Sequence, residues 1–570
     1  TTNAAGESQN SLTLGTSPGC NTVQASIAGI GNVSFQATGT LPSNSVLEIL
    51  SGNGQNLLPG VDSAPLRVRV RSAGGEPVAG LAIRFASSRG GVQIAQADVA
   101  TAADGTASTT VRMGLPSTFA VTASVRDVAT ITPVEFTINV GIANTPGLTP
   151  PQQRIAEVID TACPALAAVA NPTPRQLDLL QRCSELVSNA GTRPGEVRDA
   201  LRSLLGNKGD AQNAAALAVA KNQLDNLKTR FSALRSGARG LDLSGLNLMT
   251  GSGALPLSLL PSAIALAVGE PPEEVGADFS RWGFFATGTI GRGERDADTL
   301  DPGFDYSSYD ITAGIDYRIT DSWILGGALG LNRNNTDLGD DSGGMDASGW
   351  TISGYASWFG NTAWYADAVL SYGRNSYDLD RRIRYGIAGR TVIDQLASAS
   401  PDGDRQSLSL SIGRDFNQGA WTFGPYLRAD YSKMDFDAYT ETMSNPDGPG
   451  AGLALSVDAR ELKSLQGVLG GKLSYAMSTS WGVLVPNAQI EWVNEFEDDP
   501  ELLVTRFAFD PTGTPILIES DRIDNNYVNL GLGLSGVFAN GRSAYVYYEH
   551  VAGQDRMRSD SLAIGVRIEF

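Results

Sequence analysis

The feature that most constrains this chain is a strict alternation of apolar residues with small or charged ones, repeated to the carboxyl end. In the last ten residues the apolar positions are Leu562, Ile564, Val566, Ile568 and Phe570. Side chains of a strand alternate between its two faces, so the segment predicts a strand with one fully apolar side. One such strand is compatible with a half-buried strand of any sandwich. The pattern recurs about twelve times over the last roughly 290 residues, and this recurrence indicates a single large sheet.

The second face of these strands carries glycine, serine, asparagine and acids, which suits a wet or plugged lumen with lipid outside. The connections alternate between long, as at 332–348 and 374–406, and tight, as at 320–322 and 360–361. Outer-membrane barrels combine long outer loops with short periplasmic turns and an even strand number. Residues 282–570 therefore predict a 12-stranded antiparallel transmembrane β-barrel, and the fold class is mainly β.

Composition excludes several classes of protein. The net charge of -19 argues against nucleic acid as a partner, because phosphate binding needs a basic surface. The most apolar window, 254–268, is short and contains two prolines, so it is not a membrane helix. No signal peptide is visible, although a barrel must be exported. We expect that signal upstream, because the first repeat described below starts in mid-domain.

Two stretches of the N-terminal part resemble each other at a spacing of about 99 residues, which is the size of an immunoglobulin-like sandwich. Val23–Ser26 corresponds to Val121–Ser124, and Val33–Phe35 to Val134–Phe136. We interpret 1–42 as the C-terminal part of a truncated Ig-like repeat and 43–141 as a full repeat. The motif Gly75–Phe85 with its following Ala103–Ala107 resembles bacterial Ig-like repeats of invasin-type surface proteins. That resemblance implies a spacer or adhesive module.

A proline-rich linker at 142–151 precedes a helical linker at 152–281. Cys163 and Cys183 sit on corresponding faces of two short predicted helices, and in an exported protein they predict a disulfide. The alternative is two buried thiols. Cys20 is the odd cysteine, and its partner cannot be assigned.

The strongest helix signal is Asp210–Arg235, where an apolar stripe has 3-4 spacing and cations lie off the stripe. At 1.5 Å per residue this helix is roughly 40 Å long, about one membrane thickness. It could pack in a bundle, or it could run through the barrel. For the second case the candidate pore-helix residues are Lys221, Leu224, Lys228, Arg230, Phe231 and Arg235. The candidate lumen acids, which would complement a cationic helix or only solvate the lumen, are Asp310, Asp316, Asp367, Asp430, Glu491 and Glu549.

A surface module, a helical linker and a twelve-strand barrel ending in phenylalanine resemble a monomeric (type Va) autotransporter. The segments Gln152–Ala156 and Leu227–Gly240 are similar to those that precede such barrels. The resemblance implies an outer-membrane anchor that helps to translocate an array of Ig-like repeats to the cell surface, as an adhesin or stalk. It also implies contact with outer-membrane lipid and lipopolysaccharide, an unknown adhesive target, and help from the barrel assembly machinery with Phe570 as the recognition residue. No cofactor or metal is expected. Intimin-like proteins carry the barrel first, and this chain has the opposite order.

Two other functions were weighed. An enzymatic passenger, such as an esterase or serine protease, usually needs a catalytic histidine. The single histidine is His550, at the end of a barrel strand, and no Gly-x-Ser-x-Gly turn precedes a passenger helix, so we predict no enzyme. The alternative function is an outer-membrane channel or porin-like barrel with a periplasmic N-terminal module, which requires an open lumen.

Overall fold

The structure is a computed structural model. It describes residues 2–12, 19–39, 44–205, 209–235, 241–243, 247–250, 253–256, 282–297, 303–320, 322–360, 363–480, 482–520, 524–538 and 542–568. The chain forms two compact units, Thr1–Arg202 with Tyr385–Val392 and Asp510–Thr514, and Ser203–Arg384 with Ile393–Phe509 and Pro515–Phe570. Within the described ranges, none of the helices combines the length and apolar character needed to span a bilayer.

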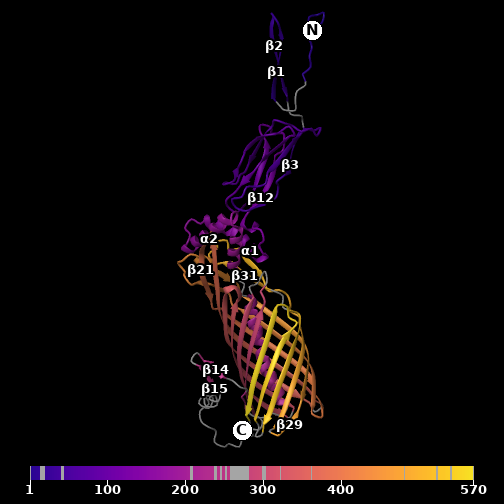
Figure 1. Ribbon diagram of the computed structural model, residues 1–570, viewed down its shortest axis with the longest axis vertical. Coiled ribbons are helices and arrows are strands. Elements are labelled where there is room, and N and C mark those ends of the chain that lie inside the picture. The colour runs from indigo at the N-terminus through magenta and orange to yellow at the C-terminus, as the bar shows by residue number, and fades with distance from the viewer. Residues whose placement is uncertain are drawn as a thin grey trace. The chain divides into compact units, whose positions relative to one another are not determined.

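The first unit contains a hairpin and a β-sandwich (Figure 1). The hairpin pairs β1 (Gly19–Ile27) with β2 (Gly31–Gly39). One sheet of the sandwich joins β3 (Val46–Ser51), β5 (Leu66–Arg71) and β9 (Thr106–Thr109). The other has the order β4 (Gln55–Leu57), β12 (Val134–Val140), β11 (Ser117–Val125), β6 (Ala82–Ala86) and β8 (Asp98–Ala100). A short ladder pairs β7 (Gln93–Ile94) with β10 (Val111–Arg112).

The core of the sandwich follows the alternation of its strands. On β5, Leu66, Val68 and Val70 are 0% exposed, and they pack in one cluster with Phe85 and Phe136 of the facing sheet. The arginines of β5 alternate with these residues and point to the opposite face. The predicted Ig-like sandwich is thus confirmed.

In the part of the chain that the structure describes, four α-helices follow the sandwich. They are α1 (Pro150–Ala167), α2 (Pro174–Ala190), α3 (Pro194–Leu204) and α4 (Gly209–Arg235). α1 and α2 begin in the same way, with a threonine N-cap, proline in the first turn and a capping box closed by Gln152 or Gln176. The box satisfies two backbone N–H groups that the helix itself leaves unpaired.

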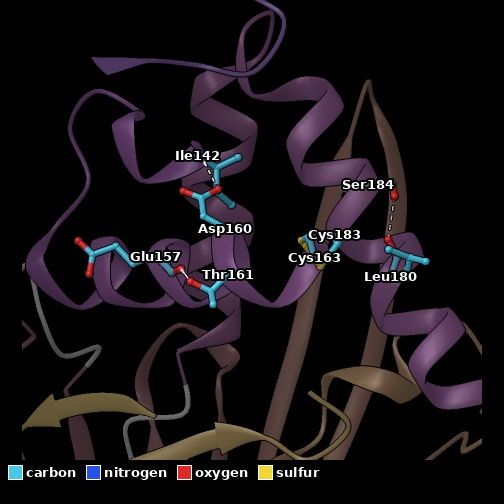
Figure 2. The surroundings of a disulfide bond; sticks show 8 residues. All are labelled: Ile142, Glu157, Asp160, Thr161, Cys163, Leu180, Cys183 and Ser184. Atoms are coloured by element: carbon cyan, nitrogen blue, oxygen red, sulfur yellow. Dashed lines mark hydrogen bonds between the residues drawn. A yellow bond between two sulfur atoms is a disulfide. The ribbon is translucent and has the colours of Figure 1, made fainter. Parts of the chain in front are cut away.

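Cys163 of α1 and Cys183 of α2 form a disulfide, with their Cα atoms 5.6 Å apart (Figure 2). Both residues are buried. The helical spacing that predicted this bond therefore identified the two facing sides correctly. Cys20 is a free, exposed cysteine on β1.

Residues 142–151 were predicted to be a linker, and part of this segment is ordered as short helical structure. A 3-10 helix, η1 (Ile142–Asn144), occupies its start, and α1 already begins at Pro150. The Asp160 carboxylate of α1 accepts the backbone N–H of Ile142 at 2.8 Å (Figure 2). It also accepts that of Ala143 at 3.1 Å. The carboxylate thus packs the segment onto α1, a long-range contact that proline content does not reveal.

Burial raises the pKa of the Asp160 carboxyl to about 6, although the two backbone donors oppose the shift. A carboxyl with a raised folded-state pKa stabilises the fold below its unfolded pKa near 4, and this contribution is lost as the pH rises through 6. The loss approaches about 3 kcal/mol. We expect the stability of α1, followed by hydrogen exchange in urea titrations of the intact protein, to fall between pH 4 and pH 7 more steeply than in Asp160→Asn. Equal pH dependence in the two proteins would contradict this.

The second unit contains a closed barrel of twelve long strands, coloured up to yellow at its C-terminal end in Figure 1. The strands are β16 (Trp282–Arg295), β17 (Phe304–Thr320), β18 (Trp323–Leu338), β19 (Gly343–Phe359), β20 (Trp364–Ile387), β22 (Asp402–Arg414), β24 (Trp421–Phe436), β28 (Arg460–Tyr475), β30 (Gly482–Glu495), β33 (Asn526–Phe538), β34 (Arg542–Ala552) and β35 (Met557–Ile568). Neighbours are antiparallel, and β16 pairs with β35 from Ile290↔Leu562 to Arg295↔Met557 to close the sheet. The predicted 12-stranded barrel is confirmed.

The outer face of the barrel is apolar and exposed, and the inner face is polar and buried. Exposed large side chains include Leu325, Leu329, Leu331, Ile352, Leu370, Leu408, Leu410, Ile412, Leu427, Leu469, Ile490, Leu530, Leu532 and Leu534. Buried polar residues alternate with them, for example Ser353 between Ile352 and Gly354 on β19. Such a face is stable against lipid and not against water.

Several predicted outer loops are in fact continuations of strands. β18 and β19 run on to the turn at 339–342, through most of the predicted loop 332–348. The predicted loop 374–406 contains the end of β20, β21 (Arg390–Ala399) and the start of β22. In these ends the apolar residues move to the inner face, as Met345 and Ala347 of β19 and Tyr377 and Leu379 of β20 show. The outward apolar row that predicted the strands therefore ends before the strands do.

Shorter strands complete the second unit. A small sheet of the outer hairpins has the order β25 (Tyr439–Thr440), β27 (Leu455–Val457), β31 (Leu502–Phe507) and β32 (Ile516–Glu519). Beside the barrel strands lie β23 (Phe416–Gln418), β26 (Thr442–Met443) and β29 (Met477–Thr479). The predicted helical linker 152–281 is not helical in its described part after Arg235, which forms β13 (Leu241–Leu243), β14 (Asn247–Thr250) and β15 (Gly253–Pro256). β13 pairs in parallel with β16.

Candidate functional site

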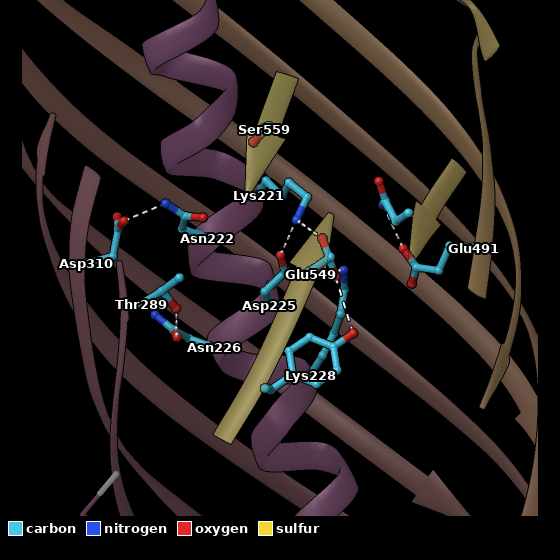
Figure 3. Close-up of polar contacts among 12 residues, drawn as sticks. Lys221, Asn222, Asp225, Asn226, Lys228, Thr289, Asp310, Glu491, Glu549 and Ser559 are labelled. Carbon is cyan, nitrogen blue, oxygen red and sulfur yellow. Dashed lines mark hydrogen bonds and ion pairs between the residues drawn. The ribbon is translucent and has the colours of Figure 1, made fainter. Parts of the chain in front are cut away.

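The helix α4 lies inside the barrel, surrounded by its strands (Figure 3). Its 27 residues rise by about 40 Å, which matches a barrel that crosses a membrane. Two large apolar clusters join it to the wall, in addition to a small one formed by Ala211, Phe304 and Leu338. One contains Ala215, Ala216, Ala220, Met345, Ala347, Tyr377, Leu379, Met434, Phe436 and Leu462, and the other contains Leu224, Leu227, Phe231, Phe285, Ile324, Ala328, Tyr355 and Val369. The first half of α4 is rich in alanine, a strong helix former whose small side chain allows close approach to the wall.

Arg230 is the most deeply buried charge of α4. Its Nε lies 2.8 Å from Asp316 Oδ2 and its Nη2 3.1 Å from Asp316 Oδ1, and the side chains are 1% and 4% exposed. The Tyr355 hydroxyl donates to the same carboxylate at 3.1 Å. The guanidinium carbon is 5.3 Å from the centroid of the Phe285 ring. The arrangement is a bidentate, desolvated ion pair, which combines strong electrostatics with a fixed geometry.

Two asparagines on one side of α4 bond to β16 and β17. The Asn222 amide donates to Asp310 Oδ2 at 2.6 Å and to Ser308 Oγ at 3.1 Å. One turn later, Asn226 Oδ1 accepts the Thr289 hydroxyl at 2.9 Å. Figure 3 shows these side chains pointing from the helix to the same part of the wall. Spaced by one turn, they fix the rotation of the helix and its height in the lumen.

Gln223 bonds to β17 and β19 and lies against β18 between them. Its Nε2 donates to Ser353 Oγ at 3.0 Å, and its Oε1 accepts the Thr312 hydroxyl at 2.8 Å. At Gly330 a Cβ would lie 2.3 Å from Gln223 Oε1, so the wall approaches the amide through a position without a side chain.

The two lysines of α4 lie on the opposite side of the helix. Lys221 Nζ is 2.5 Å from Glu549 Oε1 and 2.8 Å from Asp225 Oδ2, and Lys228 Nζ is 2.7 Å from Asp225 Oδ1 (Figure 3). A cavity of about 520 Å³ runs along this side, lined among others by Tyr306 and Tyr527. The cations therefore meet acids and a space large enough for water, which reduces the cost of burying them.

The six predicted lumen acids all point inward and are buried, and their partners differ. Asp316 and Glu549 form ion pairs with α4, and Asp310 bonds to an amide of α4. The other three bond to the wall: Asp430 and Glu491 pair with Arg428 at 2.7 and 2.6 Å, and Asp367 accepts the Ser357 hydroxyl at 2.6 Å. Alternation predicts the face of a side chain, and it does not predict which inward cation lies nearest.

Three of the six predicted pore-helix residues are ion-paired: Lys221, Lys228 and Arg230. Leu224 and Phe231 belong to the apolar cluster that contains Tyr355. Arg235 ends α4, and its side chain lies outside the described residues, as does Phe570. Sequence reasoning missed Asn222, Gln223, Asp225 and Asn226. These four polar residues are grouped within two turns of a helix whose other positions form an apolar stripe. That grouping was the signal in the sequence that could have identified them.

We expect Gly283→Ala to displace Arg230. A Cβ at this position would lie 2.3 Å from Arg230 Nη2 and 2.4 Å from Asp316 Oδ1. Overpacking of this kind costs about 1–3 kcal/mol, so alkylation of a cysteine placed at the buried Leu227 should accelerate by about tenfold or more. The measurement uses a Cys20→Ser background with the disulfide intact. Gly354→Ala is the matched control, because no atom lies within 4 Å of its Cβ position. Equal alkylation rates in both variants would argue against the steric account.

The fold and the lumen define a transmembrane barrel with a helix inside it and a β-sandwich passenger. Residues 284–549 match the family Autotransporter beta-domain, and residues 57–139 match the family Bacterial Ig-like domain (group 1). The chain is therefore a type Va autotransporter with a C-terminal barrel. The barrel resides in the bacterial outer membrane, and the passenger is exposed at the cell surface.

Known proteins with similar sequences include enzymes and other autotransporters. Esterase EstA of Pseudomonas aeruginosa is 25% identical over 293 residues, which are 51% of this chain and 43% of the esterase. The BrkA autotransporter of Bordetella pertussis is 27% identical over 251 residues, 44% of this chain and 22% of BrkA. The chain thus spans less than half the length of these relatives. The solved translocator domain of autotransporter NalP from Neisseria meningitidis is 18% identical, with a TM-score of 0.37 and coverage of 55% of this chain and 95% of that domain.

Proposed function

We propose that this autotransporter displays an array of Ig-like repeats as an adhesin or stalk. The observation that carries the proposal is the register of the hairpin β1–β2. In it Val23 pairs with Phe35 and Ala25 with Val33. In the complete sandwich Val121 pairs with Phe136 and Ala123 with Val134, so the same residue types occupy the same positions.

The two hairpins differ in what covers them. Val121 and Phe136 are 0% exposed beneath the facing sheet, whereas Val23 and Phe35 are 36% and 59% exposed. A two-stranded hairpin with an uncovered apolar face is marginal by itself. The match supports a second repeat of the same kind, whose other strands would cover this face, and repeats joined in series make a rod.

The direction of α4 supports display through the barrel. Its C-terminal part contacts Asp316 of β17 and approaches Gly283 at the start of β16, at the end of the barrel where β17 ends at Thr320 and β18 begins at Trp323. Its N-terminal part contacts Arg460 at the start of β28, among the long hairpins. Long hairpins face outward in outer-membrane barrels, so the chain N-terminal to α4 leaves the barrel at the outer surface.

The test compares cells that express the full chain with cells that express a chain lacking residues 45–141. Protease added to intact cells should remove residues 1–150 of the full chain. For an adhesin, the deletion should abolish attachment to host cells or matrix-coated surfaces while the barrel remains at normal level. For a stalk, attachment should survive and the height of the repeats above the membrane should fall. Repeats protected from protease in intact cells would overturn the proposal.

We propose a passenger without enzymatic activity, although some relatives are named esterase or lipase. The single histidine, His550, belongs to β34, and its Nδ1 lies 2.8 Å from Asp560 Oδ1. It alternates with the inward Glu549 and so faces the outside of the barrel, far in sequence from any passenger serine. Hydrolysis of short-chain nitrophenyl esters by the purified protein, lost on His550→Ala, would overturn this.

The channel alternative needs an open lumen. α4 occupies the lumen and contacts β16, β17, β18, β19 and β24, and its side chains also bond to β28 and β34. This supports a plugged anchor. Conductance in planar bilayers should be small for the full chain and large for a version lacking residues 1–240. Equal, large conductance would favour the channel.

We propose that the barrel is inserted by the barrel assembly machinery with Phe570 as the recognition residue, surrounded in the membrane by lipid and lipopolysaccharide. Deleting Phe570 should lower the yield of folded barrel in membranes and raise periplasmic degradation. Heat-modifiable gel migration of membrane fractions measures that yield. Unchanged insertion at low and high expression would count against this role.

A further inference from the structure

Besides the contacts of α4 inside the lumen, the chain is bound to the barrel at a second place. This place is the end of the barrel formed by the long hairpins. Arg381 of β20 is 3% exposed there. Its Nη1 donates to the carbonyl oxygen of Leu204 at 3.4 Å, its Nη2 to that of Leu453 at 3.1 Å, and its Nε to Glu441 Oε1 at 2.8 Å. Glu441 in turn accepts the N–H of Leu455 at 2.9 Å. One buried guanidinium thus ties the end of α3 to two outer hairpins.

Arg460 of β28 forms hydrogen bonds with the N-terminal part of α4. Its Nη1 donates to Asn213 Oδ1 and its Nη2 to Gln212 Oε1, both at 2.6 Å. Arg460 also lies 2.5 Å from Glu501 Oε2, and Asn213 Nδ2 donates to the same oxygen at 2.8 Å. The guanidinium carbon is 4.0 Å from the centroid of the Phe436 ring. Two side chains of α4, Gln212 and Asn213, therefore bond to the ion pair that Arg460 and Glu501 form on the wall.

Two further contacts complete this ring, which we call the collar: Arg295, Arg381, Arg384, Arg460, Glu441 and Glu501. The backbone N–H of Arg384 donates to Ser203 Oγ at 2.7 Å, and Arg295 lies 4.0 Å from Asp210. The collar comes from β16, β20, β28 and the outer hairpins. It surrounds the described part of the segment 203–213, namely residues 203–205 and 209–213, from several sides.

We propose that the collar holds the passenger on the barrel without a covalent link, so that the passenger stays attached when the chain between α4 and β16 is cut. The partner of the collar is this chain's own segment 203–213. The proposal adds an attachment to the display function and rests on the passenger leaving the barrel at its outer end.

The physical basis is the number and burial of the charged contacts. A charge-assisted bond is stronger where its groups are buried, as Arg381 and Arg460 are at 3% and 6% exposure, and removing one member leaves its partner buried and unpaired. Release requires Arg381, Arg460 and Glu501 to lose their partners in this segment together, which makes dissociation slow. A pull on the passenger reaches this segment before it reaches the rest of α4, so the collar carries the load first.

The experiment uses the full chain with a protease recognition sequence inserted after residue 265, between α4 and β16. The purified protein in detergent is cut, cutting is verified on a denaturing gel, and the passenger that remains with the barrel is followed over time by size-exclusion chromatography. We expect the passenger to co-elute with the barrel for hours. Arg381→Ala combined with Arg460→Ala should release it at least tenfold faster.

Two variants keep the test independent of barrel folding. Gln212→Ala with Asn213→Ala removes collar contacts from the passenger side and leaves the wall intact, and it should also accelerate release. Arg382→Ala is the matched control, because this neighbour of Arg381 pairs with Asp394 on the exposed face, and it should release at the wild-type rate. Immediate loss of the cut wild-type passenger, or release governed by Arg230→Ala alone, would overturn the proposal. The readout does not involve adhesion, so a failed adhesion assay would leave it unaffected.

Discussion

Arg230→Met is expected to destabilise the docking of α4 in the barrel by about 3–5 kcal/mol, because it leaves Asp316 buried without its counter-charge. The Tyr355 hydroxyl remains as a donor to the carboxylate and recovers only part of the loss. The measurement is the urea dependence of alkylation at a cysteine placed at Leu227, which is 0% exposed while α4 is docked.

A double variant separates the ion pair from general packing. Arg230→Met with Asp316→Leu replaces both charges by apolar groups, and it should recover most of the stability because neither partner is left uncompensated. The interaction energy from this double-mutant cycle should therefore be large. Additive losses from the two single variants would contradict a specific pair and would reduce Arg230 to a space-filling role.

Replacing both Cys163 and Cys183 by serine is expected to destabilise the helical part of the first unit by about 3 kcal/mol. The disulfide closes a loop with a sequence separation of 20, and in the chain-entropy account a cross-link of that length restricts the unfolded state by about this amount. Both sulfurs are also buried between α1 and α2, so the serine hydroxyls lose water on folding.

The measurement is hydrogen exchange of α1 and α2 in the intact protein, which should rise by about a hundredfold while the barrel is unchanged. Cys20→Ser is the matched control, because Cys20 is exposed and free, and it should exchange like the wild type. Dithiothreitol should reproduce the effect in the wild-type protein and have none in the double variant. Unchanged protection after reduction would show that packing alone holds the two helices.

The barrel could be predicted from the sequence because lipid outside and polar residues inside impose a period of two along every strand. β19 illustrates the limit: its apolar outward row ends at Trp350, yet the strand begins at Gly343. Residues 343–349 pair with β18 and β20 through backbone bonds, which do not depend on hydrophobic side chains. Strand ends beyond the lipid are therefore missed by a pattern that follows only the outward apolar row, although Met345 and Ala347 continue the alternation on the inner face.

The candidate site was predicted in part. The positions of the α4 cations and of the inward acids follow from periodicity. Their pairing does not, because Asp430 and Glu491 form ion pairs with Arg428 of the wall and not with α4. The amides of Asn222 and Gln223 bond to strands more than 80 residues away. Which strands they bond to depends on how α4 is rotated in the lumen, and a local sequence pattern does not determine that rotation.

The length of the barrel strands has a consequence for where the passenger begins. β17 and β19 have 17 residues each, which at about 3.4 Å per residue and a tilt near 40° gives a wall roughly 45 Å tall. The apolar band of an outer-membrane barrel is only about 25 Å tall. About 20 Å of wall therefore stands clear of the hydrocarbon as a pedestal. Because α4 begins among the long hairpins, the outer mouth of the lumen opens above the hydrocarbon and not level with it.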